Sequence, residues 1–201
     1  MPSENLVKIP PAPKRQPYPA SKITVGAVLF SVFSYVDNGK TTTEIQEWVV
    51  RTIRARRNSL TWRGMDMTRG GSEKPKAVNM VQKNEFTWGK LSKKTGDYGW
   101  LKNIHSCYKR QFSVGSDLPH GMFTTKRAAA VYALADEKRS LAVLEKDIGT
   151  ETDPEIIDEY RAEMADTVLV IAALTRRVKA FSGSKKSEVT PKNSSKSRST
   201  V

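Results

Sequence analysis

Gly39-Lys40-Thr41 is the segment of this chain that comes closest to a phosphate-binding loop. It matches the end of the pattern GxxxxGK[ST], in which backbone amides and a lysine hold nucleotide phosphates. However, Ser34 stands where the first glycine is needed, and no apolar strand ending in an acidic magnesium ligand follows. Asn38 and Gly39 also tolerate the positive φ angles of a type I′ turn. We therefore expect a hairpin turn here and no nucleotide hydrolysis.

Soft metal ligands and nucleophiles are few. His105, Cys107 and His120 lack CxxC or HxxxH spacing and have no fourth partner, which is a weak zinc pattern. A Cys–His nucleophile pair is equally weakly supported, because strand spacing alone places His105 beside Cys107. We expect a buried cysteine and two loop histidines. The expected site list therefore contains no metal ligand, no cofactor and no catalytic residue, and the chain is not expected to be an enzyme.

Arginines interleave with Trp48 in residues 44–57, EIQEWVVRTIRARR. An indole beside guanidinium groups is a platform on which bases stack while phosphates are neutralised. A strand would put Trp48, Arg54 and Arg56 on one face and the other two arginines opposite. A helix would instead form a basic stripe able to enter a groove. We favour the strand, because a hairpin explains the Asn-Gly turn.

The same mixture recurs later in the chain. Arg63 follows Trp62, and Tyr108 precedes Lys109 and Arg110. For Trp48, Trp62, Trp88 and Trp100 taken singly we favour a place in the core, where most tryptophans are largely buried. The candidate nucleic-acid-binding residues are Trp48, Arg51, Arg54, Arg56, Arg57, Trp62, Arg63, Lys109 and Arg110.

Charge is distributed unevenly over the 201 residues, whose formal net charge is +13. Counting Lys and Arg against Asp and Glu gives +11 for residues 1–125, −2 for 126–182 and +4 for 183–201. Such asymmetry indicates a polyanionic partner, since Lys and Arg that neutralise phosphates release condensed counterions. The alternative is that the charge only keeps the protein in solution.

Residues 22–123 are rich in β-branched and aromatic residues with frequent turn residues, which predicts an antiparallel β region. We expect a largely buried strand at 23–36, then the hairpin and a strand over 44–57. Further strands are expected at 60–67, 84–92 and 107–114. The segments 69–76 and 96–99 are expected to be loops.

After residue 124 the pattern becomes helical. Thr124 or Thr125 is suited to cap a first helix, Gly149 to end it, and Asp153 to cap a second that starts at Pro154. The short connection between them predicts an antiparallel helical hairpin. The expected packing stripes are Val131, Leu134, Leu141, Leu144 and Ile148, then Ile157, Tyr160, Met164, Val168, Ile171, Leu174, Val178 and Phe181.

The stretch Val168, Leu169, Val170 and Ile171 is apolar nearly all round. One partner helix does not cover such a surface, so either the β region or another chain must do so. The sequence therefore predicts association of copies through the helical hairpin.

The expected fold class is α+β, with four regions. Residues 1–21 form a flexible Pro-rich basic arm, 22–123 a basic β-rich domain, 124–182 the helical hairpin and 183–201 a disordered Ser/Lys-rich tail. The longest apolar run, 25–33, is far shorter than the roughly 20 residues of a membrane span. With no secretory signal and one cysteine, we expect a soluble cytoplasmic protein without a membrane partner.

These features favour a non-catalytic nucleic-acid-binding accessory protein that contacts DNA or RNA mainly through backbone phosphates. A small basic chain with tails is in the style of viral or mobile-element factors. The alternative is a basic interaction factor that binds an acidic protein, such as a host enzyme or a polymerase, and regulates or inhibits it. In that case charge would steer association and the helical hairpin would supply the apolar contact.

Overall fold

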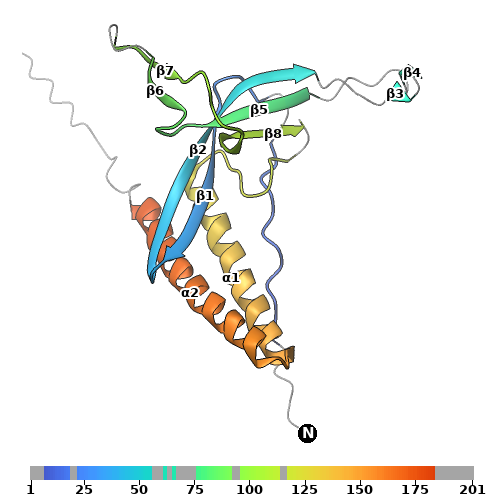
Figure 1. Ribbon diagram of the computed structural model, residues 1–201, viewed down its shortest axis with the longest axis vertical. Coiled ribbons are helices and arrows are strands. Elements are labelled where there is room, and N and C mark those ends of the chain that lie inside the picture. Colours follow the sequence, from blue (N-terminus) through green and yellow to red (C-terminus); the bar gives the residue numbers. More distant parts are fainter. Residues whose placement is uncertain are drawn as a thin grey trace, which may run out of the picture.

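The computed structural model describes residues 7–18, 22–55, 61–62, 65–66, 76–91, 96–113 and 117–183. An antiparallel β region comes first and two helices follow, which confirms the α+β class (Figure 1). Arg56, Arg57 and Arg63, together with the tail from residue 184 onward, lie outside the described residues.

A four-stranded antiparallel sheet, which we call the main sheet, has the order β1-β2-β5-β8. Its strands are β1 (Val28–Asp37), β2 (Lys40–Ala55), β5 (Lys76–Gln82) and β8 (Lys109–Ser113). The 16-residue β2 pairs with β1 along the whole length of β1 and with β5 at its far end. The strand interpretation of residues 44–57 is thus confirmed as far as Ala55.

The turn between β1 and β2 is the expected one. Asn38 and Gly39 have φ angles of 48° and 72°, which suit a type I′ hairpin, and Asp37 pairs with Lys40. In a phosphate-binding loop the lysine would stand at the start of a helix. Lys40 instead begins a strand, so the loop pattern has no helix N-terminus with which to hold phosphates.

Three strand predictions were wrong in detail. No strand was predicted for the residues of β5, which is an interior strand of the main sheet and contains the buried residues Ala77, Val78 and Met80. Within the expected strand 60–67, two short strands, β3 (Thr61–Trp62) and β4 (Met65–Asp66), pair with each other. Of the described residues 84–91 in the expected strand 84–92, only Trp88–Lys90 form a strand, β6. It pairs with β7 (Tyr98–Trp100), which overlaps the expected loop at 96–99.

A β-bulge changes the faces of β2. The register against β5 shifts between Val50 and Thr52, so Arg51 is the extra residue. Trp48 and Val50 face the core before the bulge, and Ile53 packs against the same core after it. Arg54 therefore lies on the opposite face from Trp48. The prediction that these two residues share a face was wrong, because an inserted residue reverses strand alternation.

The sheet has apolar residues on both faces. The larger core joins Leu29, Trp48, Val50, Val78 and Met80 of the sheet to Ile23, Leu118 and Met122. A smaller core on the other face packs Phe123, Ala129 and Tyr132 against Phe30 and Val32. Phe123 and Phe30 exchange backbone hydrogen bonds, so this segment lies beside β1 like a further strand.

The helices α1 (Lys126–Thr150) and α2 (Pro154–Gly183) form the expected hairpin. Thr125 caps α1 by accepting a hydrogen bond from the Ala128 N–H at 3.2 Å, and Asp153 accepts the Glu155 N–H at 3.0 Å. Figure 1 shows the hairpin lying along β1 and β2, and both helices contact this part of the sheet.

The predicted helical stripes were partly wrong. Val131 and Val168 are exposed, whereas Tyr132, Thr167 and Val170 are buried. Each helix packs against the other helix and against the sheet, so its buried stripe is not the one that helix–helix contact alone would select.

The N-terminal arm is attached at its inner end. The Gln16 side chain donates to Thr124 Oγ1 at 2.8 Å and accepts the Thr124 N–H at 3.0 Å. The Leu118 N–H donates to the Gln16 carbonyl at 2.9 Å, and Tyr18 packs against the larger core. Residues 16–18 of the expected arm 1–21 therefore contact the folded part of the chain. Neither of the two described helices is long and apolar enough to cross a membrane.

Candidate nucleic-acid interface

The face of the main sheet that turns away from Trp48 carries a group of cations. Val49 and Val81 pair with each other and alternate with Trp48, Val50 and Met80 of the larger core, so they face away from it. Lys109 pairs with Val81 and lies on the same face. Arg54 lies further along the same face. Arg51 at the bulge and Lys83 just after β5 join them through the aromatic contacts described next. We call Arg51, Arg54, Lys83 and Lys109 the cationic face.

Two indoles hold two of these cations in place. The Arg51 guanidinium carbon lies 4.5 Å from the centre of the Trp100 ring, and the Lys83 Nζ lies 4.8 Å from that of Trp88. The two rings meet edge to face, with centroids 5.2 Å apart, because Trp88 and Trp100 pair directly across β6 and β7. Each cation–π contact contributes about 0.5–1 kcal/mol at an exposed site. The contacts pre-position charges that long side chains would otherwise leave mobile.

Two glycines face each other in the small hairpin of β6 and β7. Gly89 pairs with Gly99, next to the pair formed by Trp88 and Trp100. A Cβ on Gly99 would lie 2.6 Å from Leu91 Cδ1, nearer than real Cβ contacts. A larger residue there would require the exposed Leu91 side chain to move, which the end of a flexible side chain can do.

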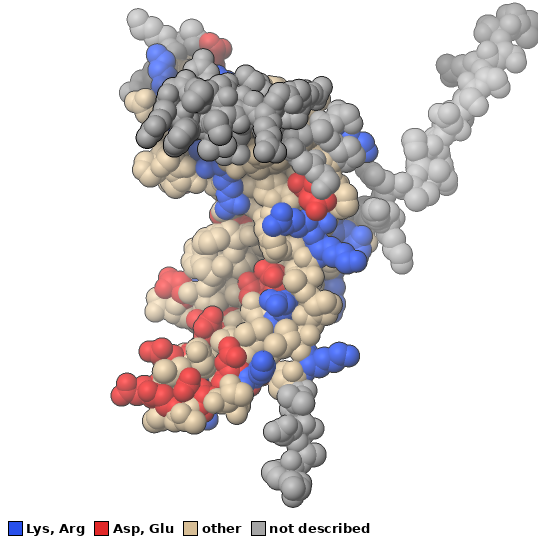
Figure 2. All heavy atoms as spheres, turned by 90° about the vertical axis from the view of Figure 1, so that its right-hand side faces the viewer, with Lys and Arg blue, Asp and Glu red and all other residues tan. Residues whose placement is uncertain are grey.

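Electrostatics separates the two ends of the molecule. Glu47, whose carbonyl accepts the Lys83 N–H, forms a 2.7 Å ion pair with Lys126 and is thereby neutralised. Figure 2 shows Asp and Glu gathered at the end of the helical hairpin, and Lys and Arg nearer the sheet. The acidic residues near the α1–α2 connection are Glu145, Asp147, Glu151, Asp153, Glu155, Asp158 and Glu159.

Trp48 is core, not a stacking platform. Only 1% of it is exposed, and its Nε1–H donates to Ser31 Oγ at 2.9 Å. Arg110 lies over the same ring at 4.5 Å, on the face opposite to Lys109. The burial agrees with the core position favoured for a single tryptophan, whereas the use of Trp48 as a stacking platform was wrong, because the ring has no free face.

The other predicted residues divide into three groups. Arg51, Arg54 and Lys109 come together on one face. Trp62 lies in β3, but its side chain is outside the described part of the structure, as are Arg56, Arg57 and Arg63. Sequence reasoning missed Lys83, Trp88 and Trp100. The one local signal for them is the pair of segments Trp-Gly-Lys and Tyr-Gly-Trp, each with a central glycine.

Comparisons were made with models of known protein families, with curated proteins and with solved structures. None of the three found a match. The function of this chain is therefore inferred from its own residues and their geometry.

His105 and Cys107 do lie side by side, but Cys107 is exposed, so the expectation of a buried cysteine was wrong. His105 Nδ1 is 3.0 Å from Cys107 Sγ and accepts the Cys107 N–H at 3.3 Å. The histidine thereby caps the short 3₁₀ helix Ser106–Tyr108. This local capping accounts for the contact.

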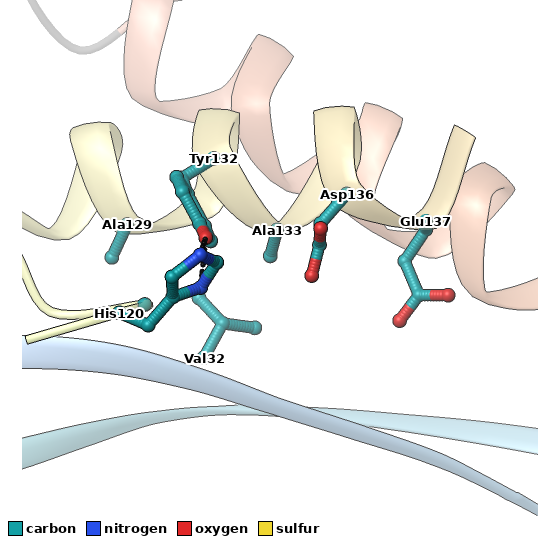
Figure 3. Close-up of a pocket in the computed structure, with 8 residues that line it drawn as sticks. Val32, His120, Ala129, Tyr132, Ala133, Asp136 and Glu137 are labelled. Carbon is teal, nitrogen blue, oxygen red and sulfur yellow. Dashed lines mark hydrogen bonds between the residues drawn. The ribbon is translucent and has the colours of Figure 1, made fainter. Parts of the chain in front are cut away.

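A small pocket of about 170 Å³ lies between α1 and β1 (Figure 3). The Tyr132 hydroxyl is hydrogen-bonded to the His120 ring, and Asp136 and Glu137 line the same space. Burial, and then the charge of Asp136, raise the pKa of both Tyr132 and Glu137 above their ordinary values. No group of three or more His, Cys, Asp and Glu side chains within the described ranges is placed to hold a metal ion.

The apolar stretch of α2 is only partly covered. Val170 is buried, whereas Val168 and Leu169 are 49% and 39% exposed and Ile171 is half-buried. The helix packs against α1, β1 and β2 on its covered side. Association of copies through the exposed residues stays a prediction.

Proposed function

We propose that this chain binds nucleic acid through phosphate contacts made by the cationic face. The observation that carries the proposal is the convergence of Arg51, Arg54, Lys83 and Lys109 on one sheet face, two of them seated on paired indoles. The cationic face extends along β2 from Glu47, beside which Lys83 lies, to Arg54. At about 3.3 Å per residue, and without counting the bulge residue, this length is about 20 Å.

The geometry supports backbone contacts over base readout. Arginine and lysine contacts to phosphate position a protein on nucleic acid without carrying sequence information. Between the cations, Asn79 Nδ2 donates to Thr52 Oγ1 at 3.0 Å, so one donor of this amide is already used within the sheet. The acidic end of the helical hairpin repels phosphates and favours an approach to the sheet.

The proposal predicts strongly salt-dependent binding. Fluorescence anisotropy of a labelled 20-base-pair duplex should give a log affinity against log salt slope of about −3.6 if all four cations each neutralise one phosphate. The same sequence as a single strand should give about −2.8. Affinity for scrambled sequences should be unchanged. If the protein binds neither probe, or binds with a slope near zero, the proposal is wrong and an acidic protein becomes the better partner.

A further inference from the structure

A hollow of about 470 Å³ lies on the opposite side of the sheet from the cationic face. Phe33 of β1 pairs directly with Glu44 of β2. By strand alternation, their side chains point to the same side of the sheet as Leu29 and Trp48 of the larger core. The hollow therefore continues that side of the sheet beyond the core. Its lining residues are Phe33, Glu44, Gln46, Gln82, Asn84, Glu85, Phe86 and Tyr108, and we call it the acidic groove.

Three aromatic rings are presented to the acidic groove. Asn84 Oδ1 accepts the Phe86 N–H at 3.0 Å, a local turn that holds Phe86 in position. Phe86 stacks on Tyr108 with centroids 5.8 Å apart and planes at 10°, although it is 60% exposed. Phe33 is 50% exposed and lies beside Tyr35. Exposed aromatic surface of this kind marks a binding site more often than chance.

Two carboxylates give the groove its preference for charge. Within the described residues, ion pairs involve Glu47 and Asp158, and neither Glu44 nor Glu85 takes part in one. Carboxylates beside aromatic faces attract Lys and Arg side chains by charge and by cation–π contact. The same carboxylates repel phosphate, so the groove suits a ligand of opposite charge to that of the cationic face.

A basic segment of this chain starts beside β2, on the opposite face of the sheet from the groove. Thr41 and Thr43 line a hollow with Arg176, Arg177 and Ala180 near the end of α2, and Glu44 follows Thr43 (Figure 1). Residues 184–201 then contain five Lys and Arg and a single Glu. Eighteen residues span up to about 60 Å when extended, so the segment is long enough to pass around the edge of β2.

We propose that the acidic groove binds lysine and arginine side chains of the C-terminal segment 184–201 of the same chain. The proposal does not depend on nucleic-acid binding. Occupation of the groove would hold a basic segment against the body of the protein through charge and ring contacts.

Trypsin cleavage of the full chain tests this proposal. At low salt, the rate at which trypsin removes the segment by cleavage after Lys185, Lys186 or Lys192 is measured by intact-mass spectrometry. The groove variant combines Glu44→Gln with Glu85→Gln, and the control combines Glu145→Gln with Glu159→Gln on the helices, with the same change in charge. Phe86→Ala is a second groove variant that leaves the charge unaltered. Circular dichroism checks that all variants are folded.

Removal of the segment should be about fivefold faster in both groove variants than in the native chain and in the control, and the native rate should not change on tenfold dilution. Equal rates in all four proteins would overturn the proposal. Equal acceleration in the groove and control carboxylate variants would show a general charge effect and overturn it as well. Protection that is lost on dilution would assign the groove to the segment of a second copy and so contradict binding within one chain.

Discussion

Replacing Arg54 and Lys109 together by glutamate should lower the affinity for duplex DNA about 100-fold at 0.1 M salt. Each lost phosphate contact makes the log–log salt slope shallower by about 0.9, which lowers the affinity at 0.1 M salt about eightfold relative to 1 M salt. The two glutamates also add negative charges that repel phosphate. The slope should become shallower by about 1.8. Both side chains are exposed, so the fold should be retained. Anisotropy titrations over a range of salt concentrations measure both quantities.

The matched control is Lys138→Glu with Lys146→Glu on α1, two exposed residues away from the sheet face. This pair changes the net charge by the same amount and should alter affinity only a few-fold through the long-range field. If the two double variants weaken binding equally, net charge and not the cationic face determines the affinity.

Trp48→Ala should lower the free energy of unfolding by about 3–5 kcal/mol, the usual cost of emptying a large buried aromatic site. The ring is 1% exposed, and its N–H donates to Ser31, whose hydroxyl lies 3.2 Å from Gln46 Oε1. Loss of the indole leaves a cavity and disrupts this chain of hydrogen bonds. Denaturant unfolding followed by circular dichroism measures the change. Nucleic-acid affinity per folded molecule should be unchanged, because the ring lies on the other side of the sheet.

Phe86→Ala is the control for the stability measurement, since it also removes a large ring but from an exposed position. Surface substitutions usually change stability by less than about 0.5 kcal/mol, and the stacking contact with Tyr108 adds a similar amount. If Trp48→Ala costs no more than Phe86→Ala, Trp48 does not anchor the larger core.

Local signals predicted the helical hairpin and the β1–β2 turn. Thr125, Asp153 and Pro154 act within one turn of their helix, and the Asn38-Gly39 conformation depends on those two residues alone. Such features can be identified from sequence because their energetics involve neighbours in the chain.

Features that depend on distant contacts were missed. The bulge at Arg51 is defined by the register between β2 and β5, which no local pattern reveals, and it moves Arg54 to the other face. Trp88 and Trp100 meet only through pairing of β6 with β7. Arg51, Arg54 and Lys109 were identified by residue type, but the Lys83 contribution required the tertiary structure. The burial of Trp48 follows the general tendency of single tryptophans, although the residue was also included among the binding residues.

Lysine footprinting tests the central proposal most directly, because it locates bound nucleic acid on the native chain without substitution. Acetylation rates of individual lysines are compared by mass spectrometry with and without a saturating duplex. Lys83 and Lys109 should be protected about tenfold or more, whereas Lys138 and Lys146 on α1 should react at unchanged rates. Equal protection of all four lysines, or protection confined to α1, would contradict binding at the cationic face.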